Sequence, residues 1–277
     1  MFLIRIVAVI WCSVLPATAA DQLAALQPSA KFEVIGQSKS QATWRLSSGF
    51  DVASGDYGAQ RATTLSYAPM GLSYSKGLWT FSVDTGYIDV TGPASFVDIA
   101  DLGFTADDAK ALGLDENFSA QGFDNISLSA RVAAFDLWRQ NLFIDFTGKV
   151  LVPTASRAKG LGTGAVDSAL SIDATKLTGR TTWFATVGYK FRGGDSSRRN
   201  SWSAGYGFSR ALGHGFSTGL SYDLRQTGIH DGPFTHELTA FLTLGLASSS
   251  SVTAYGLIGR PTDHTGAGVG VRFSHGF

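Results

Sequence analysis

The feature that most constrains this chain is a two-residue alternation of apolar and polar side chains, which recurs from about residue 43 to the last residue. It is clearest in the final stretch, Gly266–Phe277, where Val269, Val271 and Phe273 share one parity and Arg272 has the other. Successive side chains of a β-strand point to opposite faces, so this pattern predicts a strand with two different faces. An exposed terminal edge strand invites aggregation, and one way to cover it is to pair the last strand with the first.

The same alternation divides residues 41–277 into about twelve segments, each close to the ~9–11 residues that a tilted membrane strand needs. Short joins near residues 76, 138, 179, 214 and 249 alternate with longer ones near 56, 105, 158, 196, 230 and 262. Such alternation of short turns and long loops is typical of an outer-membrane barrel. Within the second segment, Pro69 cannot donate a ladder hydrogen bond and predicts a bulge or a change of parity.

The soluble alternative is a secreted β-sandwich, which would spread aromatic residues through its core. Here the apolar faces hold no charge, and the opposite faces collect nearly all of it. We therefore predict an all-β fold, a transmembrane antiparallel up-and-down β-barrel of about twelve strands.

The N-terminus predicts export from the cytoplasm. Arg5 precedes an apolar run from Ile6 to Leu15, and Pro16 and small residues follow it. This pattern predicts a signal peptide over residues 1–20, then a periplasmic lead-in over 21–40 and the barrel over 41–277. We expect the mature protein in the outer membrane of a Gram-negative bacterium, with outer-membrane lipid and the barrel-assembly machinery as partners.

Several functional classes are disfavoured by composition. Charged residues make up 16% of the chain and the net charge is zero, which does not suggest a nucleic-acid binder. The five histidines have no metal-ligand spacing, so we expect no metal, no cofactor and no enzyme activity. An outer-membrane lipid hydrolase that uses His236 with Ser221 or Ser203 stays an alternative, as does a structural or adhesive barrel.

The polar faces of the segments carry a balanced set of charges, which we expect to line a lumen. The basic residues are Arg45, Arg131, Lys149, Lys190, Arg192, Arg225 and Arg272, and the acidic ones are Asp51, Asp84, Asp145, Asp167, Asp173, Asp223 and Glu237. Buried charges must be paired or solvated. Eight strands give a filled interior and sixteen an open channel, so about twelve predict a narrow or gated passage for small solutes.

The longest segment without strand periodicity runs from about residue 91 to 121. Thr105 is a suitable N-cap, Asp107 and Asp108 fall in the first turn that would follow, and Gly113 is a suitable end, so a short helix is expected there. Long loops of this kind are often lids or constrictions. We predict that Asp101, Asp107 and Asp108 belong to a loop gate.

Several short motifs between Thr43 and Phe277 are similar to those of a known family. They are Ser54–Gly58, Thr91–Pro93, Gly148–Lys149 with Pro153–Ala155, Gly160–Gly164, Gly188–Gly193, Leu220–Gln226 and His236–Thr239. The family resembled is that of the outer-membrane porin or transporter proteins labelled as belonging to the meta-pathway of phenol degradation. The resemblance implies an outer-membrane barrel that moves small compounds, including aromatic or apolar ones, without a catalytic residue.

The chain departs from that family in the 91–121 loop, where the family commonly has a shorter Gly-rich insert. At the other end of the chain, Phe273 and Phe277 resemble the terminal signal by which barrel-assembly machinery recognises its clients.

Overall fold

The computed structural model describes residues 8–10, 28–32, 42–55, 63–92, 118–137, 140–194, 199–226, 234–247, 249–261 and 266–277. The barrel strands are β3 (Thr43–Gly55), β4 (Thr63–Lys76), β5 (Trp79–Gly92), β7 (Ile126–Leu137), β8 (Leu142–Val152), β9 (Asp167–Thr178), β10 (Thr181–Phe191), β11 (Ser201–Gly213), β12 (Phe216–Gln226), β13 (Phe234–Ala247), β14 (Ser250–Pro261) and β15 (Gly266–Gly276). A shorter strand, β6 (Phe118–Phe123), pairs with the loop-side half of β5.

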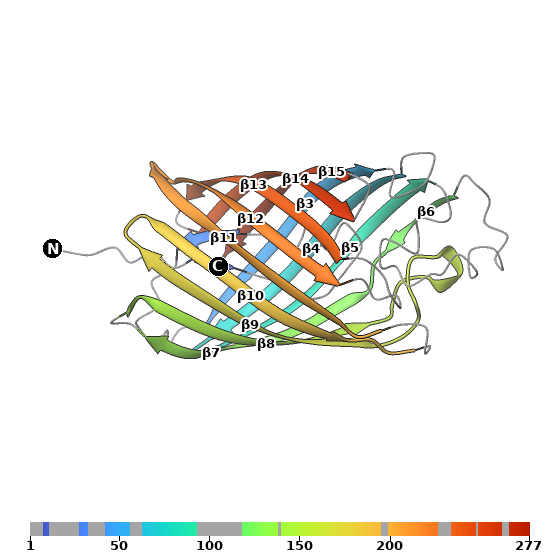
Figure 1. The fold of residues 1–277 in the computed structure, drawn as a ribbon, viewed down its shortest axis with the longest axis horizontal. Helices are drawn as coiled ribbons and strands as arrows, with labels where there is room; N and C mark the ends of the chain where they lie inside the picture. Colours follow the sequence, from blue (N-terminus) through green and yellow to red (C-terminus); the bar gives the residue numbers. More distant parts are fainter. Residues whose placement is uncertain are drawn as a thin grey trace.

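Successive barrel strands pair antiparallel, and the last strand closes on the first (Figure 1). Within the described ranges the sheet has 13 strands, which are the twelve barrel strands and β6. The backbone of Phe277 extends the closing seam, because its N–H donates to Trp44 O at 2.9 Å and its carbonyl accepts from Trp44 N at 3.0 Å. The all-β, twelve-strand closed barrel predicted from the sequence is confirmed.

The two faces of the barrel wall differ sharply in chemistry. Along β3 the exposed and shielded positions alternate, so that Phe50 is 56% exposed on the outside while the next residue, Asp51, is fully buried. The same alternation places large apolar side chains such as Trp183, Val187 and Leu238 on the outer surface. An apolar outer surface around a closed barrel is the arrangement that a bilayer requires. No helix among the described residues has the length and apolar character to cross a membrane.

The short joins that are fully described, between β4 and β5, between β9 and β10, and between β11 and β12, lie at one end of the barrel (Figure 1). Gly77 and Gly179 have φ of 60° in the turns between β4 and β5 and between β9 and β10. Left-handed backbone of this kind favours glycine and suits tight hairpins. These joins are therefore where the sequence predicts them, and most of the longer joins contain segments outside the described residues.

The predicted irregularity at Pro69 is wrong. Ser48 pairs with Met70 and Asp51 with Tyr67, which is one uninterrupted register, and on the other side Pro69 pairs with Gly86 without a shift. The proline removes one backbone donor, but the pairs before and after it hold both neighbouring strands in place.

Register shifts occur elsewhere, at Ala133/Phe135, Ala211/Gly213 and Gly245/Ala247, and a further irregularity lies between β6 and β7. Tyr87 pairs with Phe123 and Asp84 with Ser127, so the two β5 residues between them face three residues of the other strand. This β-bulge contains Asp124, whose N–H donates to Gly86 O at 2.9 Å. The bulge separates β7, which pairs with β8, from β6.

Two further strands, β1 (Ala8–Ile10) and β2 (Pro28–Phe32), form a separate two-stranded sheet, and β2 contacts β13 and β14. The predicted signal peptide and periplasmic lead-in are not tested by this arrangement and stay predictions. The expected helix at 105–113 lies outside the described residues.

Candidate functional site

The predicted lining residues all point to the inner side of the barrel wall. Each occupies one of the alternate strand positions that are shielded, while the exposed apolar side chains occupy the positions between them. Arg192 continues this alternation one residue beyond β10. Several are almost fully shielded, as for Lys190 at 1% and Arg272 at 3% exposure. That these side chains line a path for solutes stays a prediction.

One enclosed charge cluster joins Asp51, Arg272 and Tyr255 near the closing seam. Both terminal nitrogens of Arg272 donate to Asp51, one to each carboxyl oxygen, and the Tyr255 hydroxyl donates to Asp51 Oδ1. Gly49 and Gly270 make this approach possible, because a Cβ at Gly49 would overlap Arg272 and one at Gly270 would overlap Asp51 and Tyr255. A bidentate pair with an additional donor is the form in which a buried carboxylate and guanidinium satisfy each other.

A second enclosed pair lies between β9 and β10. Lys190 Nζ is 3.1 Å from Asp167 Oδ2, and the backbone N–H of Gly193 donates to Asp167 Oδ1 at 3.0 Å. The side chains of Lys190 and Asp167 are each only 2% exposed, so the ion pair is enclosed by the surrounding chain.

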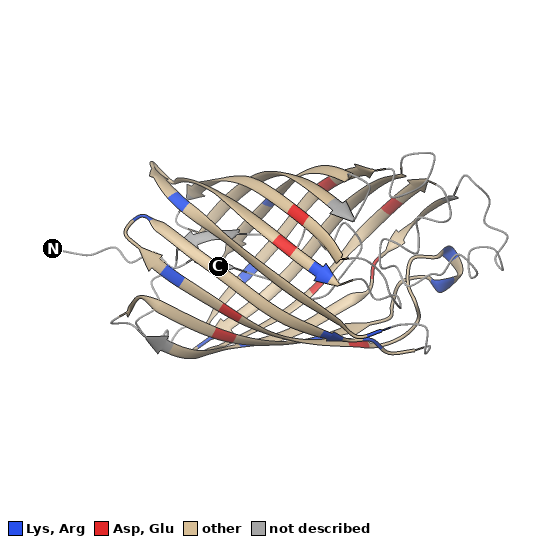
Figure 2. Cartoon of the chain, in the orientation of Figure 1, with Lys and Arg blue, Asp and Glu red and all other residues tan. Residues whose placement is uncertain are grey.

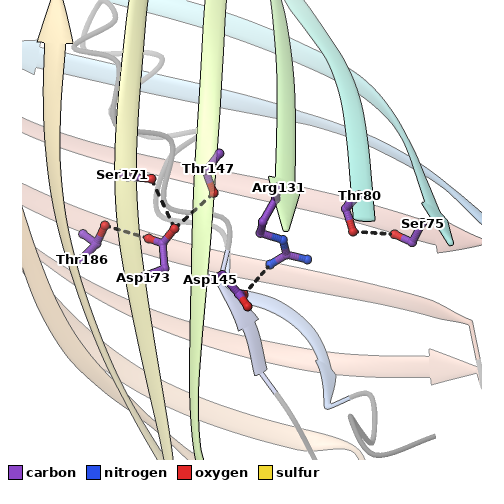
Figure 3. A network of polar contacts seen from close by, with 8 residues as sticks. All are labelled: Ser75, Thr80, Arg131, Asp145, Thr147, Ser171, Asp173 and Thr186. Atoms are coloured by element: carbon purple, nitrogen blue, oxygen red, sulfur yellow. Dashed lines mark hydrogen bonds and ion pairs between the residues drawn. The ribbon is translucent and has the colours of Figure 1, made fainter. Parts of the chain in front are cut away.

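A third network occupies the wall nearer the short turns (Figure 3). Asp173 accepts hydrogen bonds from Thr186 at 2.7 Å and from Thr147 and Ser171 at 3.3 Å each. Beside it, Arg131 Nη1 lies 3.5 Å from Asp145 Oδ2. Every carboxyl group of this network therefore receives donors from the chain itself.

A fourth group, on β12 and β13, is less completely satisfied. Asp223 and Glu237 are paired across the two strands, and each is 7% exposed. Asp223 Oδ2, Glu237 Oε1 and Arg225 Nη1 are buried without a hydrogen-bond partner among the described residues. This group differs from the other three, in which every carboxyl group receives a donor from the chain, although Arg272 Nε is also buried without a hydrogen-bond partner among the described residues.

Sequence reasoning missed an apolar patch on the inner wall toward the loop end. Leu65 on β4 and Ile88 and Val90 on β5 are buried there, together with Leu161 from the segment between β8 and β9. The parity of β5 contained the signal, because an alternation that places Tyr87 outward also places Ile88 and Val90 inward and Asp89 outward. The lumen is thus polar over most of its wall and apolar over β4 to β6 near the loops.

The remaining predicted residues fall into two groups. Phe273 and Phe277 lie on the exposed side of the wall, with 38% and 67% of their surfaces exposed, and their role as an assembly signal stays a prediction. Asp101, Asp107 and Asp108 lie outside the described residues, so the predicted loop gate is untested.

The structure does not assemble the serine and histidine that the hydrolase alternative needs. His236 is exposed on the outer surface, where its Nδ1 is 2.6 Å from the Tyr222 hydroxyl, whereas Ser221 is shielded on the inner face. Ser203 shares the inner parity. The described ranges also contain no group of three or more histidine, cysteine, aspartate or glutamate residues that could hold a metal ion.

Comparison with solved structures shows that the barrel is similar to outer-membrane channels and porins. The COG4313 outer membrane channel from Pseudomonas putida F1 superposes with a TM-score of 0.63 at 15% identity, covering 88% of this chain and 100% of that one. The NanC porin gives a TM-score of 0.54 at 10% identity, covering 82% of this chain and 98% of that one. The KdgM porin gives 0.50 at 10% identity, with the same coverage of both chains as NanC.

These identities show a shared fold. No protein-family model matches the sequence, and no curated protein matches it either. The meta-pathway family resembled by the sequence motifs is not confirmed by these comparisons.

Proposed function

We propose that this protein is an outer-membrane channel that lets small solutes pass through a narrow lumen. The observation that carries the proposal is the contrast between the two faces of one closed wall. The outer face presents side chains such as Phe50 and Val187 to the surroundings, while the inner face collects the charges. A bilayer accepts the first face, and a passage for polar molecules needs the second.

The enclosure of the lining side chains supports a narrow passage. Arg272, Lys190 and Glu237 are all at least nine-tenths shielded, whereas a wide water-filled pore would expose its lining. Twelve strands also lie between the filled eight-strand barrels and the open sixteen-strand porins. The passage therefore suits small solutes that move singly.

The motif resemblance supports solutes that carry an apolar or aromatic portion. The apolar side chains of the inner wall do not add to that support, because Leu65, Ile88, Val90 and Leu161 are each at most 2% exposed and are closed to a solute in this structure.

The test is reconstitution of the full chain into planar lipid bilayers and into solute-loaded vesicles. We expect stepwise ion conductance, and swelling of vesicles in small solutes that decreases with solute size. A correctly folded barrel that conducts no ions and passes no solute would contradict the proposal. An outer-membrane structural or adhesive role would then be the better assignment.

A further inference from the structure

Two pairs of acidic residues lie in one row of paired residues that crosses the wall. The two members of each pair lie opposite each other on neighbouring strands. Reading from β8 to β13, one residue per strand, the row is Asp145, Asp173, Thr186, Gly205, Asp223 and Glu237. We call its four acidic members, Asp145, Asp173, Asp223 and Glu237, the acidic row. Red bands on β13, β12, β9 and β8 form an oblique line across the barrel wall (Figure 2).

Like charges directly opposite each other on adjacent strands are destabilising, so each pair needs compensation. The pair on β8 and β9 obtains it from the chain. Asp173 accepts three hydrogen bonds from hydroxyl groups, and Asp145 is paired with Arg131. Nothing further is needed to explain this half of the row.

The pair on β12 and β13 is not compensated in the same way. Asp223 Oδ2 and Glu237 Oε1 have no hydrogen-bond partner among the described residues, although both side chains are more than nine-tenths buried. In the adjacent row Ser221 is paired with Thr239, and the hydroxyl oxygen of each is likewise buried without a partner. Four buried oxygens on two neighbouring strands therefore lack donors.

Arg225 compensates this pair only in part. It lies on the same face two residues beyond Asp223 and attracts both carboxyl groups electrostatically. Its Nη1 nevertheless has no hydrogen-bond partner within the described chain. Two carboxylates and one guanidinium leave a formal charge of −1, and a buried unpaired charge is costly.

We propose that Asp223 and Glu237 hold the positively charged group of a passing solute, such as a primary ammonium ion. The inference rests on the proposed channel function and names the solute class that the lumen favours. An ammonium group supplies three N–H donors and one positive charge, which are what these oxygens lack. Ser221 and Thr239 offer further acceptors, and Arg225 Nη1 is available to an acceptor elsewhere on the same solute.

The experiment measures ion selectivity of the full chain in planar bilayers under a concentration gradient. Reversal potentials are recorded in potassium chloride and, separately, in ethylammonium chloride. We expect both cations to be more permeant than chloride. Asp223→Asn and Glu237→Gln, which keep the shape of each side chain, should each lower the cation-to-chloride permeability ratio by about threefold or more.

Two matched variants remove the same charge elsewhere. Asp89→Asn changes an exposed carboxyl on the outer face of β5 and should leave selectivity unchanged. Asp173→Asn removes a member of the acidic row that already has donors, and its effect should be the smaller one. Seminative electrophoresis confirms that each variant forms the folded barrel before its currents are compared.

The possible outcomes test the proposed cation site separately from the proposed channel function. Loss of preference for both cations in the Asp223 and Glu237 variants supports the site, whereas loss for potassium alone would overturn its assignment to ammonium-bearing solutes. A wild-type channel that prefers chloride, or an Asp173→Asn effect as large as that of Asp223→Asn, would overturn the assignment while leaving the channel intact. Absence of any conductance would overturn the channel and this inference with it.

Discussion

At the scale of single residues, the inner wall depends on charged groups that are enclosed together. Asp51 receives two donors from Arg272 and one from Tyr255, and all three side chains are buried. Such a pair is weak evidence for extra stability when complete, but removal of one partner leaves an uncompensated charge. The cost of breaking it should therefore depend on which partner is removed.

We predict that Arg272→Met lowers the free energy of unfolding by about 3–5 kcal/mol, because it leaves the Asp51 carboxylate buried without its cation. Tyr255→Phe removes only one hydrogen bond to a charged group and should cost about 1.5–3 kcal/mol. Denaturant titration in lipid vesicles measures both. The double variant Asp51→Asn with Arg272→Met should lose less than the sum of the single losses, and strict additivity would show that the two groups do not act as a pair.

A glycine on the inner face makes room for Asp223. A Cβ built on Gly205 would overlap Asp223 Oδ1 and come within 3.2 Å of Thr186 Cγ2. Gly205→Ala should therefore displace the carboxyl group and cost about 1–3 kcal/mol of unfolding free energy, besides weakening cation preference. Gly256→Ala is the matched control on β14, where the nearest atom to the added methyl group is Gly268 O at 3.8 Å.

The control should have the opposite sign, since alanine in a strand interior is more favourable than glycine by about 0.5–1 kcal/mol. Equal losses in the two variants would mean that the effect comes from the strand backbone and not from the space beside Asp223.

At the scale of elements, the closing seam between β3 and β15 is the contact on which the barrel depends. Phe277 contributes two backbone hydrogen bonds with Trp44 at this seam, and its side chain is 67% exposed. Its backbone and its side chain can thus be separated experimentally. Deletion of Phe277 removes both, whereas Phe277→Ala retains the backbone pairing.

We predict that deletion of Phe277 reduces the amount of folded barrel in the membrane more than it alters the conductance of the barrels that do form. Seminative electrophoresis of membrane fractions measures the first quantity, and single-channel recording the second. If Phe277→Ala is as defective as the deletion, the side chain is the assembly signal; if it assembles normally, backbone closure is the more important contribution. Normal insertion of the truncated chain would contradict the prediction.

The strands themselves could be predicted from the sequence because each has a two-residue period with unlike faces, and closure follows from the apolar outer face of β15. The bulge between β6 and β7 could not be predicted, since Asp124 and Asn125 have the composition of an ordinary turn. The structure shows what holds them in the wall. Tyr67 donates to Asp124 Oδ2 at 3.3 Å, and Asn125 Oδ1 accepts from Ala155 N at 3.1 Å.

The inward parity of the lining charges was likewise predictable, but their pairing was not. Sequence alternation places Asp51, Asp167 and Asp223 on the same face without stating which cation each one meets. Pairing depends on the register between strands, and a shift of one residue would send every side chain to the other face. That Asp51 meets Arg272, while Asp223 Oδ2 meets no donor among the described residues, is therefore a property of the assembled sheet.

At the scale of the whole molecule, the height of the apolar band on the outer surface must match the thickness of the hydrocarbon core of the bilayer. Outward side chains of β10 run from Thr181 beside the short turn to Phe191 at the loop end, and Val187, 52% exposed, lies well inside the strand between them. All backbone groups of a closed barrel are paired within the wall, so the membrane meets only these side chains. The free-energy cost of placing a charge at one of these positions should therefore depend on the depth of that position in the bilayer.

We predict that Val187→Arg lowers the free energy of unfolding in lipid vesicles by about 2–4 kcal/mol, whereas Thr181→Arg at the turn end costs about 0–1 kcal/mol. The reason is that a guanidinium held near the middle of the bilayer loses its hydration, while one at the edge reaches the interface. Reversible denaturant titrations of the two variants and the wild type supply the comparison. Because both residues lie on the same strand and face the same side, a difference in strand propensity cannot produce the gradient. Equal and small losses at the two positions would mean that this wall is surrounded by water, which would refute the membrane-spanning barrel and the channel that depends on it.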